Sequence, residues 1–123
     1  MEQNKYPLDE RLIEFSVRMI EFIEELPEKK SAIYLGGQLL RSGTSPALNY
    51  GESRAAESRK DFIHKIKVCL KELRESHNCL KILYRSKLFK DENKIQFLLT
   101  ECNELISIFV KSIKTAMINT KNN

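Results

Sequence analysis

Apolar residues recur every three or four positions along almost the whole chain, which is the spacing of amphipathic α-helices. No stretch alternates with a period of two residues, so no β-sheet is expected. The pattern predicts an all-α protein with helices at about residues 9–26, 28–56, 58–87 and 91–118. The first helix carries two adjoining apolar stripes, formed by Leu12, Phe15, Met19, Phe22 and Leu26 and by Ile13, Val17, Ile20 and Ile23.

The connections between these helices are only a few residues long. Short connections place consecutive helices side by side in opposite directions, so we predict a single domain, residues 1–123, folded as an antiparallel up-down-up-down four-helix bundle. Asp9, Ser58 and Asp91 stand where N-caps are needed. The first and fourth helices carry more apolar surface than one bundle core requires. Such a surplus is typical of a subunit interface and predicts a homo-oligomer.

The stretch 38–62 is the one place where the helical pattern is interrupted and resumes. Pro46 lacks the N–H that an unbroken helix requires, so the second helix is expected to be kinked or broken near residues 42–46. Gly36 and Gly37 are expected at a close approach of another backbone. Polar residues gather here at helical spacing, and they are Gln38, Arg41, Ser42, Ser45, Asn49 and Glu52.

These six residues form the structural polar motif. A broken helix exposes backbone groups that need hydrogen-bond partners. We therefore interpret the motif as a set of internal partners that hold the kink, with Arg41 paired to Glu52. The alternative is that the same side chains line a binding pocket.

The net charge of +4 is unevenly distributed. Residues 1–30 have five Lys/Arg against eight Asp/Glu, whereas residues 54–94 have twelve against six. At about 100° per residue, six cations of the third helix fall within one arc of about 80° that contains no acid. They are Lys60, Lys67, Lys71, Arg74, Lys81 and Arg85. We refer to them as the basic stripe.

A solvated helix face usually mixes charges of both signs, whereas a stripe without acids suits the phosphates of RNA or DNA. The basic stripe is therefore a candidate nucleic-acid site, with Arg54 and Arg59 assisting, and a solvated face is the alternative. Few aromatic residues accompany it, so contacts to the nucleic-acid backbone are expected rather than base stacking.

Catalytic and metal-binding patterns are lacking. His64 and His77 have no Glu three residues earlier, as a di-iron bundle would require. Cys69, Cys79 and Cys102 lie on or beside apolar stripes, which raises the pKa of a thiol and makes it inert. The phosphate-binding loop spacing is also absent. We expect no enzyme activity, metal, cofactor or small-molecule substrate. Unpaired cysteines, the lack of a signal peptide and the lack of a long apolar run predict a cytoplasmic protein outside the membrane.

Three segments resemble one protein family: QLLRSGTS at 38–45 with Asn49 and Glu52 after it, SRKDFIHK at 58–65 and LKELRE at 70–75. The family comprises small four-helix-bundle proteins encoded in intervening sequences of bacterial 23S ribosomal RNA genes. A relative in fold is the accessory protein that partners the reverse transcriptase of diversity-generating retroelements. The resemblance covers about 40 residues. The sequence departs from the family pattern at three places. The departures at Pro46 and Tyr50-Gly51 concern the geometry of the helix, and the departure at Cys79 concerns core packing.

The resemblance implies a bacterial protein that assembles as a homopentameric ring and binds RNA or DNA. Together with the basic stripe, it leads to the hypothesis of a non-enzymatic, oligomeric nucleic-acid-binding bundle. The alternative hypothesis is a protein-interaction scaffold or accessory subunit that makes no direct contact with nucleic acid.

Overall fold

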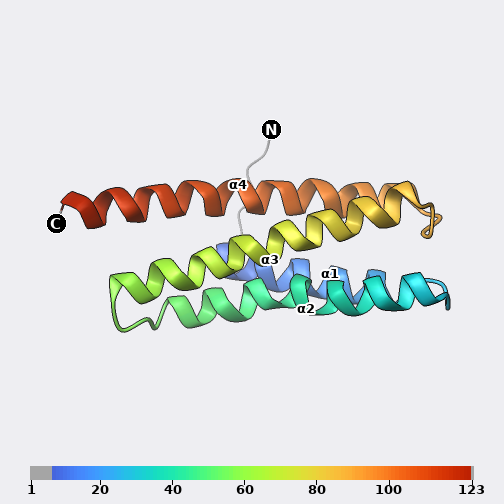
Figure 1. Cartoon of the computed structure of the whole chain (residues 1–123), viewed down its shortest axis with the longest axis horizontal. Helices are drawn as coiled ribbons and strands as arrows, with labels where there is room; N and C mark the ends of the chain where they lie inside the picture. The colour runs from blue at the N-terminus through green and yellow to red at the C-terminus, as the bar shows by residue number, and fades with distance from the viewer. Residues whose placement is uncertain (1–6, 123) are drawn as a thin grey trace.

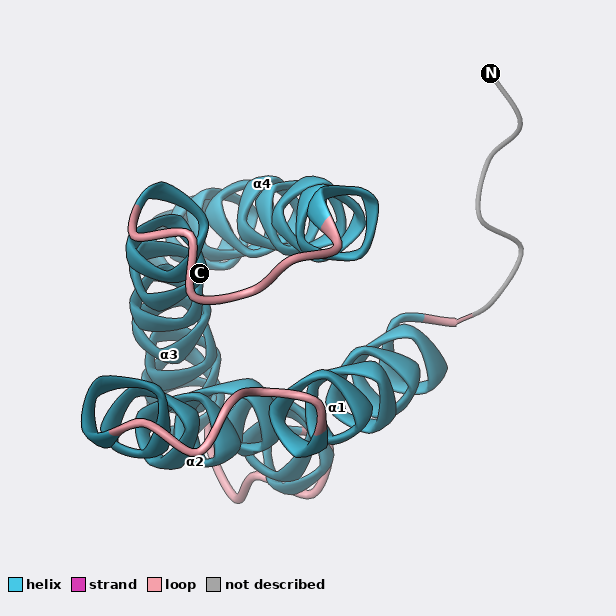
Figure 2. Ribbon diagram, turned by 90° about the vertical axis from the view of Figure 1, so that its right-hand side faces the viewer, coloured by secondary structure: helices cyan, strands magenta, loops and turns pink. Residues whose placement is uncertain are grey.

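The computed structural model describes residues 7–122, which form four helices and contain no strand. The helices are α1 (Leu8–Glu24), α2 (Lys30–Ser53), α3 (Arg59–Arg85) and α4 (Glu92–Asn122). The α1–α2 and α3–α4 connections lie at one end of the elongated molecule and the α2–α3 connection lies at the other (Figure 1). Each helix packs against the next in the sequence, whereas α1 and α4 touch over a shorter stretch and diverge in the end-on view (Figure 2).

The core is built from the predicted apolar stripes. In α1 the buried residues are Leu12, Phe15, Met19 and Phe22. They form one hydrophobic core with buried residues of α3 and α4, among them Leu73, Leu80, Leu105 and Phe109. The second stripe of α1 behaves differently, because Ile13, Val17 and Ile20 are 50%, 43% and 41% exposed. One chain therefore buries one of the two stripes and leaves most of the other in contact with solvent.

The predicted caps are present at two helix starts. Ser58 Oγ accepts a hydrogen bond from the Asp61 N–H at 3.0 Å, and Asp91 Oδ1 accepts from the N–H groups of Asn93 and Lys94. The expectation for Asp9 was wrong. Pro7 occupies the N-cap position of α1, and Asp9 lies in the first turn, where a negative charge is favourable to the helix dipole.

The break predicted near residues 42–46 does not occur, because α2 continues through Pro46 to Ser53. Pro46 is fully buried, and its carbonyl accepts a hydrogen bond from Cys69 Sγ of α3 at 3.4 Å. On the α1 side, the Gly43 carbonyl accepts a hydrogen bond from Ser16 Oγ at 3.2 Å. Contacts on both sides hold the helix together where the backbone loses one hydrogen bond to proline.

The expected close approach lies at a different glycine. A Cβ at Gly37 would meet nothing within 4 Å, and a Cβ at Gly36 would make ordinary contacts of 3.4 Å with Ile23 and Leu26. A Cβ at Gly43 would lie 2.6 Å from Cγ of Met19. Gly43 is therefore the position at which α1 and α2 need a residue without a side chain.

Candidate nucleic-acid interface

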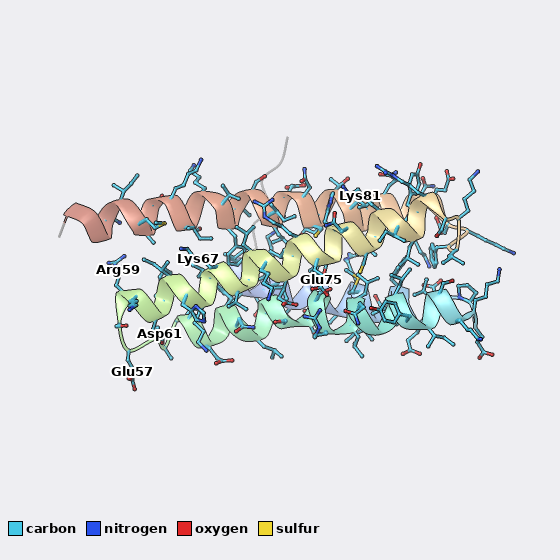
Figure 3. The ribbon with its side chains drawn as sticks, viewed as in Figure 1. Glu57, Arg59, Asp61, Lys67, Glu75 and Lys81 are labelled. Carbon is cyan, nitrogen blue, oxygen red and sulfur yellow. The ribbon has the colours of Figure 1, made fainter. Side chains whose placement is uncertain are left out.

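The charged residues of α3 separate by sign around the helix. Lys67 and Lys81 lie on the side of α3 toward α4, whereas Asp61 and Glu75 lie on the side toward α2 (Figure 3). Five members of the basic stripe are exposed and Lys81 is half-buried. The predicted stripe is therefore a continuous feature of the molecular surface along most of α3.

The positive charge of this stripe is not neutralised by neighbouring acids. Within the part of the chain that the structure describes, its six side chains make no hydrogen bond or ion pair. Of the three α3 acids, which all lie outside the arc of the stripe, Glu72 and Glu75 are both bound by Arg41 of α2. The positive charges therefore remain available to an external anion.

His77 lies on α3 near Lys81. Burial of the imidazole lowers the pKa of His77, and the Lys81 ammonium lowers it further. His77 is therefore neutral at physiological pH and adds no charge to the stripe.

The structure separates Arg54 from the basic stripe and places Arg59 beside it, on the side of α3 toward α4 (Figure 3). Arg54 follows the last turn of α2 and forms an ion pair with Asp9 at 3.0 Å. Arg59 begins α3 and, together with Phe62, lines a hollow of about 420 Å³ against Lys111 and other residues of α4. Both side chains are exposed, but only Arg59 adjoins the line of cations along α3, at its Lys60 end.

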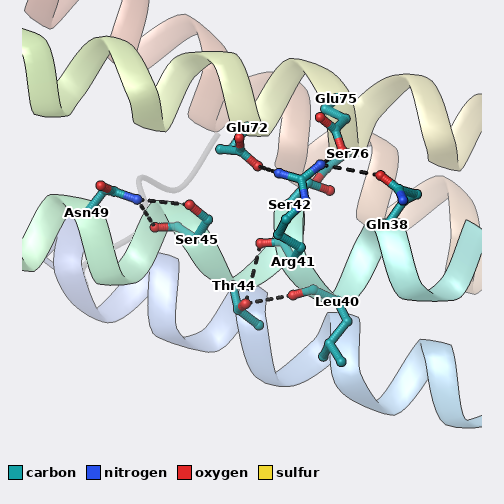
Figure 4. Close-up of polar contacts among 10 residues, drawn as sticks. All are labelled: Gln38, Leu40, Arg41, Ser42, Thr44, Ser45, Asn49, Glu72, Glu75 and Ser76. Carbon is teal, nitrogen blue, oxygen red and sulfur yellow. Dashed lines mark hydrogen bonds and ion pairs between the residues drawn. The ribbon is translucent and has the colours of Figure 1, made fainter.

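The residues of the structural polar motif bond to one another and to other residues of the chain, but Arg41 does not pair with Glu52 as predicted (Figure 4). Arg41 forms ion pairs with Glu72 and Glu75 and none with Glu52. Glu52 pairs instead with Lys65 at 2.9 Å. The sequence could not show this, because it does not reveal how far α3 is shifted along α2. Gln38 Oε1 completes the set around the Arg41 guanidinium at 3.4 Å.

The remaining motif residues stabilise α2 and its contact with α3. Ser76 Oγ donates to Ser42 Oγ at 2.8 Å, and both side chains are fully buried. Asn49 Nδ2 donates to the carbonyl and to the hydroxyl of Ser45 at 3.1 and 2.8 Å. No buried side-chain polar atom lacks a hydrogen-bond partner among the residues described. The motif therefore leaves no buried polar group free to bind a ligand.

The cysteines have the environment of core residues. All three are free and buried. Burial raises the pKa of Cys69 to about 12 and that of Cys102 to about 12, and burial also raises the pKa of Cys79. Residues 7–122 contain no cluster of three or more His, Cys, Asp or Glu side chains that could hold a metal ion.

An apolar surface on α1 and α2 was only partly visible in the sequence. Ser16 of α1 contacts Gly43 of α2, and at about 100° per residue the exposed apolar residues of both helices lie on the outer side of this contact. They are Ile13, Val17, Ile20, Ile33, Leu40 and Leu48, each at least 41% exposed. We refer to them as the α1–α2 apolar face. The seven- and eight-residue spacing of the α2 members was the signal that could have revealed it.

None of the described helices has both the length and the apolar character that a membrane span requires.

The amino-acid sequence over residues 8–111 matches the family model described as 23S rRNA-intervening sequence protein. One similar solved structure is a protein of unknown function from the S23 ribosomal protein family of Bacteroides thetaiotaomicron. It is 29% identical, with a TM-score of 0.81 over 88% of this chain and 99% of that chain. No curated protein matches the chain significantly.

Proposed function

Because this chain belongs to the 23S rRNA-intervening sequence protein family, we propose that it is a non-enzymatic, oligomeric bundle protein that binds RNA or DNA through the basic stripe of α3. The observation that carries the proposal is the exposed line of cations without ion-pair partners. Arg41 binds Glu72 and Glu75 on the adjacent side of the helix, so these two carboxylates oppose an approaching phosphate less.

The expected binding is electrostatic and strongly dependent on salt. Each phosphate that a protein cation neutralises releases condensed counterions, and log K then falls with log[salt] at a slope of about −0.9 per contact for duplex DNA. If all six stripe residues contact phosphates, the slope is about −5.

The test is a titration of labelled RNA and of labelled duplex DNA at several salt concentrations. A variant with Lys67, Lys71 and Arg74 changed to Ala should bind more weakly, and its slope should be about 3 units shallower. The matched control removes three exposed cations outside the stripe, Lys29, Lys30 and Lys111. Unchanged binding by the stripe variant, or equal losses in both variants, would refute the proposal.

The oligomer is the second part of the proposal, and the α1–α2 apolar face supports it. Six large apolar residues on one outer side of two packed helices are an unfavourable surface for an isolated chain in water. A second copy that covers them would remove this cost, and the family resemblance points to a pentamer. Light scattering should give a mass well above the 14.4 kDa of one chain.

The interface can be tested by charge substitution. Val17→Glu and Leu40→Glu place a charge on the apolar face and should lower the measured mass. Ile82→Glu is the control, because Ile82 is similarly exposed, at 51%, but belongs to α3. A wild-type protein that has the mass of one chain would refute this part of the proposal.

The scaffold alternative rests on the same apolar face. If the face receives a different protein, purification should yield a stable protein partner and an absorbance ratio that excludes nucleic acid. The three free, buried cysteines fit a reducing compartment and support a cytoplasmic location for either function.

A further inference from the structure

We infer that the nucleic acid bound by the basic stripe is double-stranded and is recognised by its phosphate backbone, without readout of base sequence. This inference rests on the proposed function and concerns the class of nucleic acid that the stripe can accommodate. Three features of the described residues carry it: the lack of aromatic platforms, the flanking of α3 by other helices, and the straightness of the line of cations.

Proteins that bind single strands combine a positively charged groove with aromatic side chains on which the bases stack. The stripe has neither component. The aromatic residues of α3, Phe62 and Tyr84, are partly buried against the core, and the strongly exposed aromatic residues of the described chain, Tyr34 and Phe97, belong to α2 and α4. His64 is the one exposed ring on α3 itself.

Two hollows on the described surface also lie elsewhere. One is bounded by α1 and by the first turns of α4, and the other lies between the start of α3 and the second half of α4. Neither contains a residue of the basic stripe. A single strand laid on the stripe would therefore have its phosphates bound but its bases left in water, without the stacking that is worth about 1–3 kcal/mol per base.

The flanking helices decide how α3 can approach a duplex. An isolated helix of about 10–12 Å diameter can enter a major groove of about 12 Å width. In this protein α3 packs against α2 on one side and against α4 on the other, so the surface that it presents is wider than one helix (Figure 1). The stripe can therefore reach phosphates along the groove edges, whereas deeper entry of α3 into the groove would bring the flanking helices against the phosphate backbones.

The line of cations matches the dimensions of a duplex. Lys60 and Arg85 are separated by about 38 Å along the helix at 1.5 Å per residue, and one turn of duplex DNA spans about 34–36 Å. The cations are held on one rigid helix, so a flexible strand must be straightened to follow them and loses conformational entropy. The phosphates of a duplex are already ordered.

The experiment compares three fluorescent ligands of equal length in anisotropy titrations of the full chain: a mixed-sequence duplex, a duplex of scrambled sequence and an unstructured oligo-dT strand. Both duplexes should bind with equal affinity and about tenfold more tightly than the single strand, because the duplex has the higher charge density. The salt slopes should be about −5 for duplex and about −4 for single strand if all six cations bind phosphate.

The variants connect this preference to the stripe. The Lys67/Lys71/Arg74→Ala variant should lose the duplex preference, whereas the Lys29/Lys30/Lys111→Ala control and His64→Ala should keep it. Equal or tighter binding of the single strand would overturn the inference while leaving the proposed function intact, as would a marked difference between the two duplexes. Failure to bind these three ligands, together with failure to bind the labelled RNA of the first titration, would instead overturn the proposed function itself.

Discussion

Gly43 provides the sharpest test of how α1 and α2 pack, because the chain contains a matched control for it. In Gly43→Ala the new Cβ would lie 2.6 Å from Met19 Cγ and 3.3 Å from Met19 Cβ. Contacts under 3 Å force one group to move. Met19 is fully buried, and the atoms in conflict are near its backbone rather than at its flexible end. The substitution therefore pushes α1 and α2 apart.

The magnitude follows from two opposing effects. Overpacking of a filled core costs about 1–3 kcal/mol, whereas replacing a glycine in a helix by alanine contributes about 1 kcal/mol of helix propensity. Gly37→Ala has the second effect alone, because a Cβ at Gly37 meets nothing within 4 Å. We expect Gly37→Ala to raise the free energy of unfolding by up to about 1 kcal/mol. Gly43→Ala should be less stable than Gly37→Ala by about 1–3 kcal/mol.

The assay is unfolding in urea, followed by circular dichroism, with both variants and the wild type at the same chain concentration because oligomerisation shifts apparent stability. A thermal scan should separate the two variants by about 4 °C per kcal/mol for a chain of this length. Met19→Ala combined with Gly43→Ala should show a favourable coupling energy, since the shortened side chain makes room for the new methyl group. Equal stability of Gly43→Ala and Gly37→Ala would refute the close packing of the two helices.

Three further predictions concern buried polar groups. Arg41→Met removes the partner of a nearly buried glutamate and should lower the free energy of unfolding by about 1–3 kcal/mol; full rescue by Arg41→Lys would contradict the forked contact. Ser42→Ala or Ser76→Ala alone should cost about 1–3 kcal/mol, whereas the double variant should cost less than the sum of the two, because no hydroxyl is then left unpaired. The folded-state pKa of both Cys69 and Cys102 is raised to about 12. These thiols therefore lose their protons at a lower pH in the unfolded chain than in the folded chain. Denaturation midpoints should therefore fall as the pH rises above about 8.5, and Cys→Ala variants should flatten this slope.

The order of the helices, their approximate limits and the buried stripe of α1 were predictable because they depend on local periodicity. Phe15 and Met19 are core residues in any bundle that uses that face, whatever the partner helix. The basic stripe was predictable for the same reason, since its residues lie on one helix and their relative directions follow from about 100° per residue. The predicted break at Pro46 was wrong, because the expectation that proline ends a helix takes no account of the contacts with α1 and α3 that hold α2 together.

Contacts between helices required the tertiary structure. Arg41 could have paired with Glu52, the one acid of α2, or with any acid on a neighbouring helix, and the packing of α3 against α2 selected Glu72 and Glu75. The close approach at Gly43 and the exposure of Leu40 were also undetermined by periodicity. Sequence spacing sets the direction of a side chain around its own helix, and it therefore determined the fold class and the stripe. The rotation and axial shift of one helix against another are set by how their surfaces interlock, and they decided which polar groups pair and which apolar residues remain uncovered.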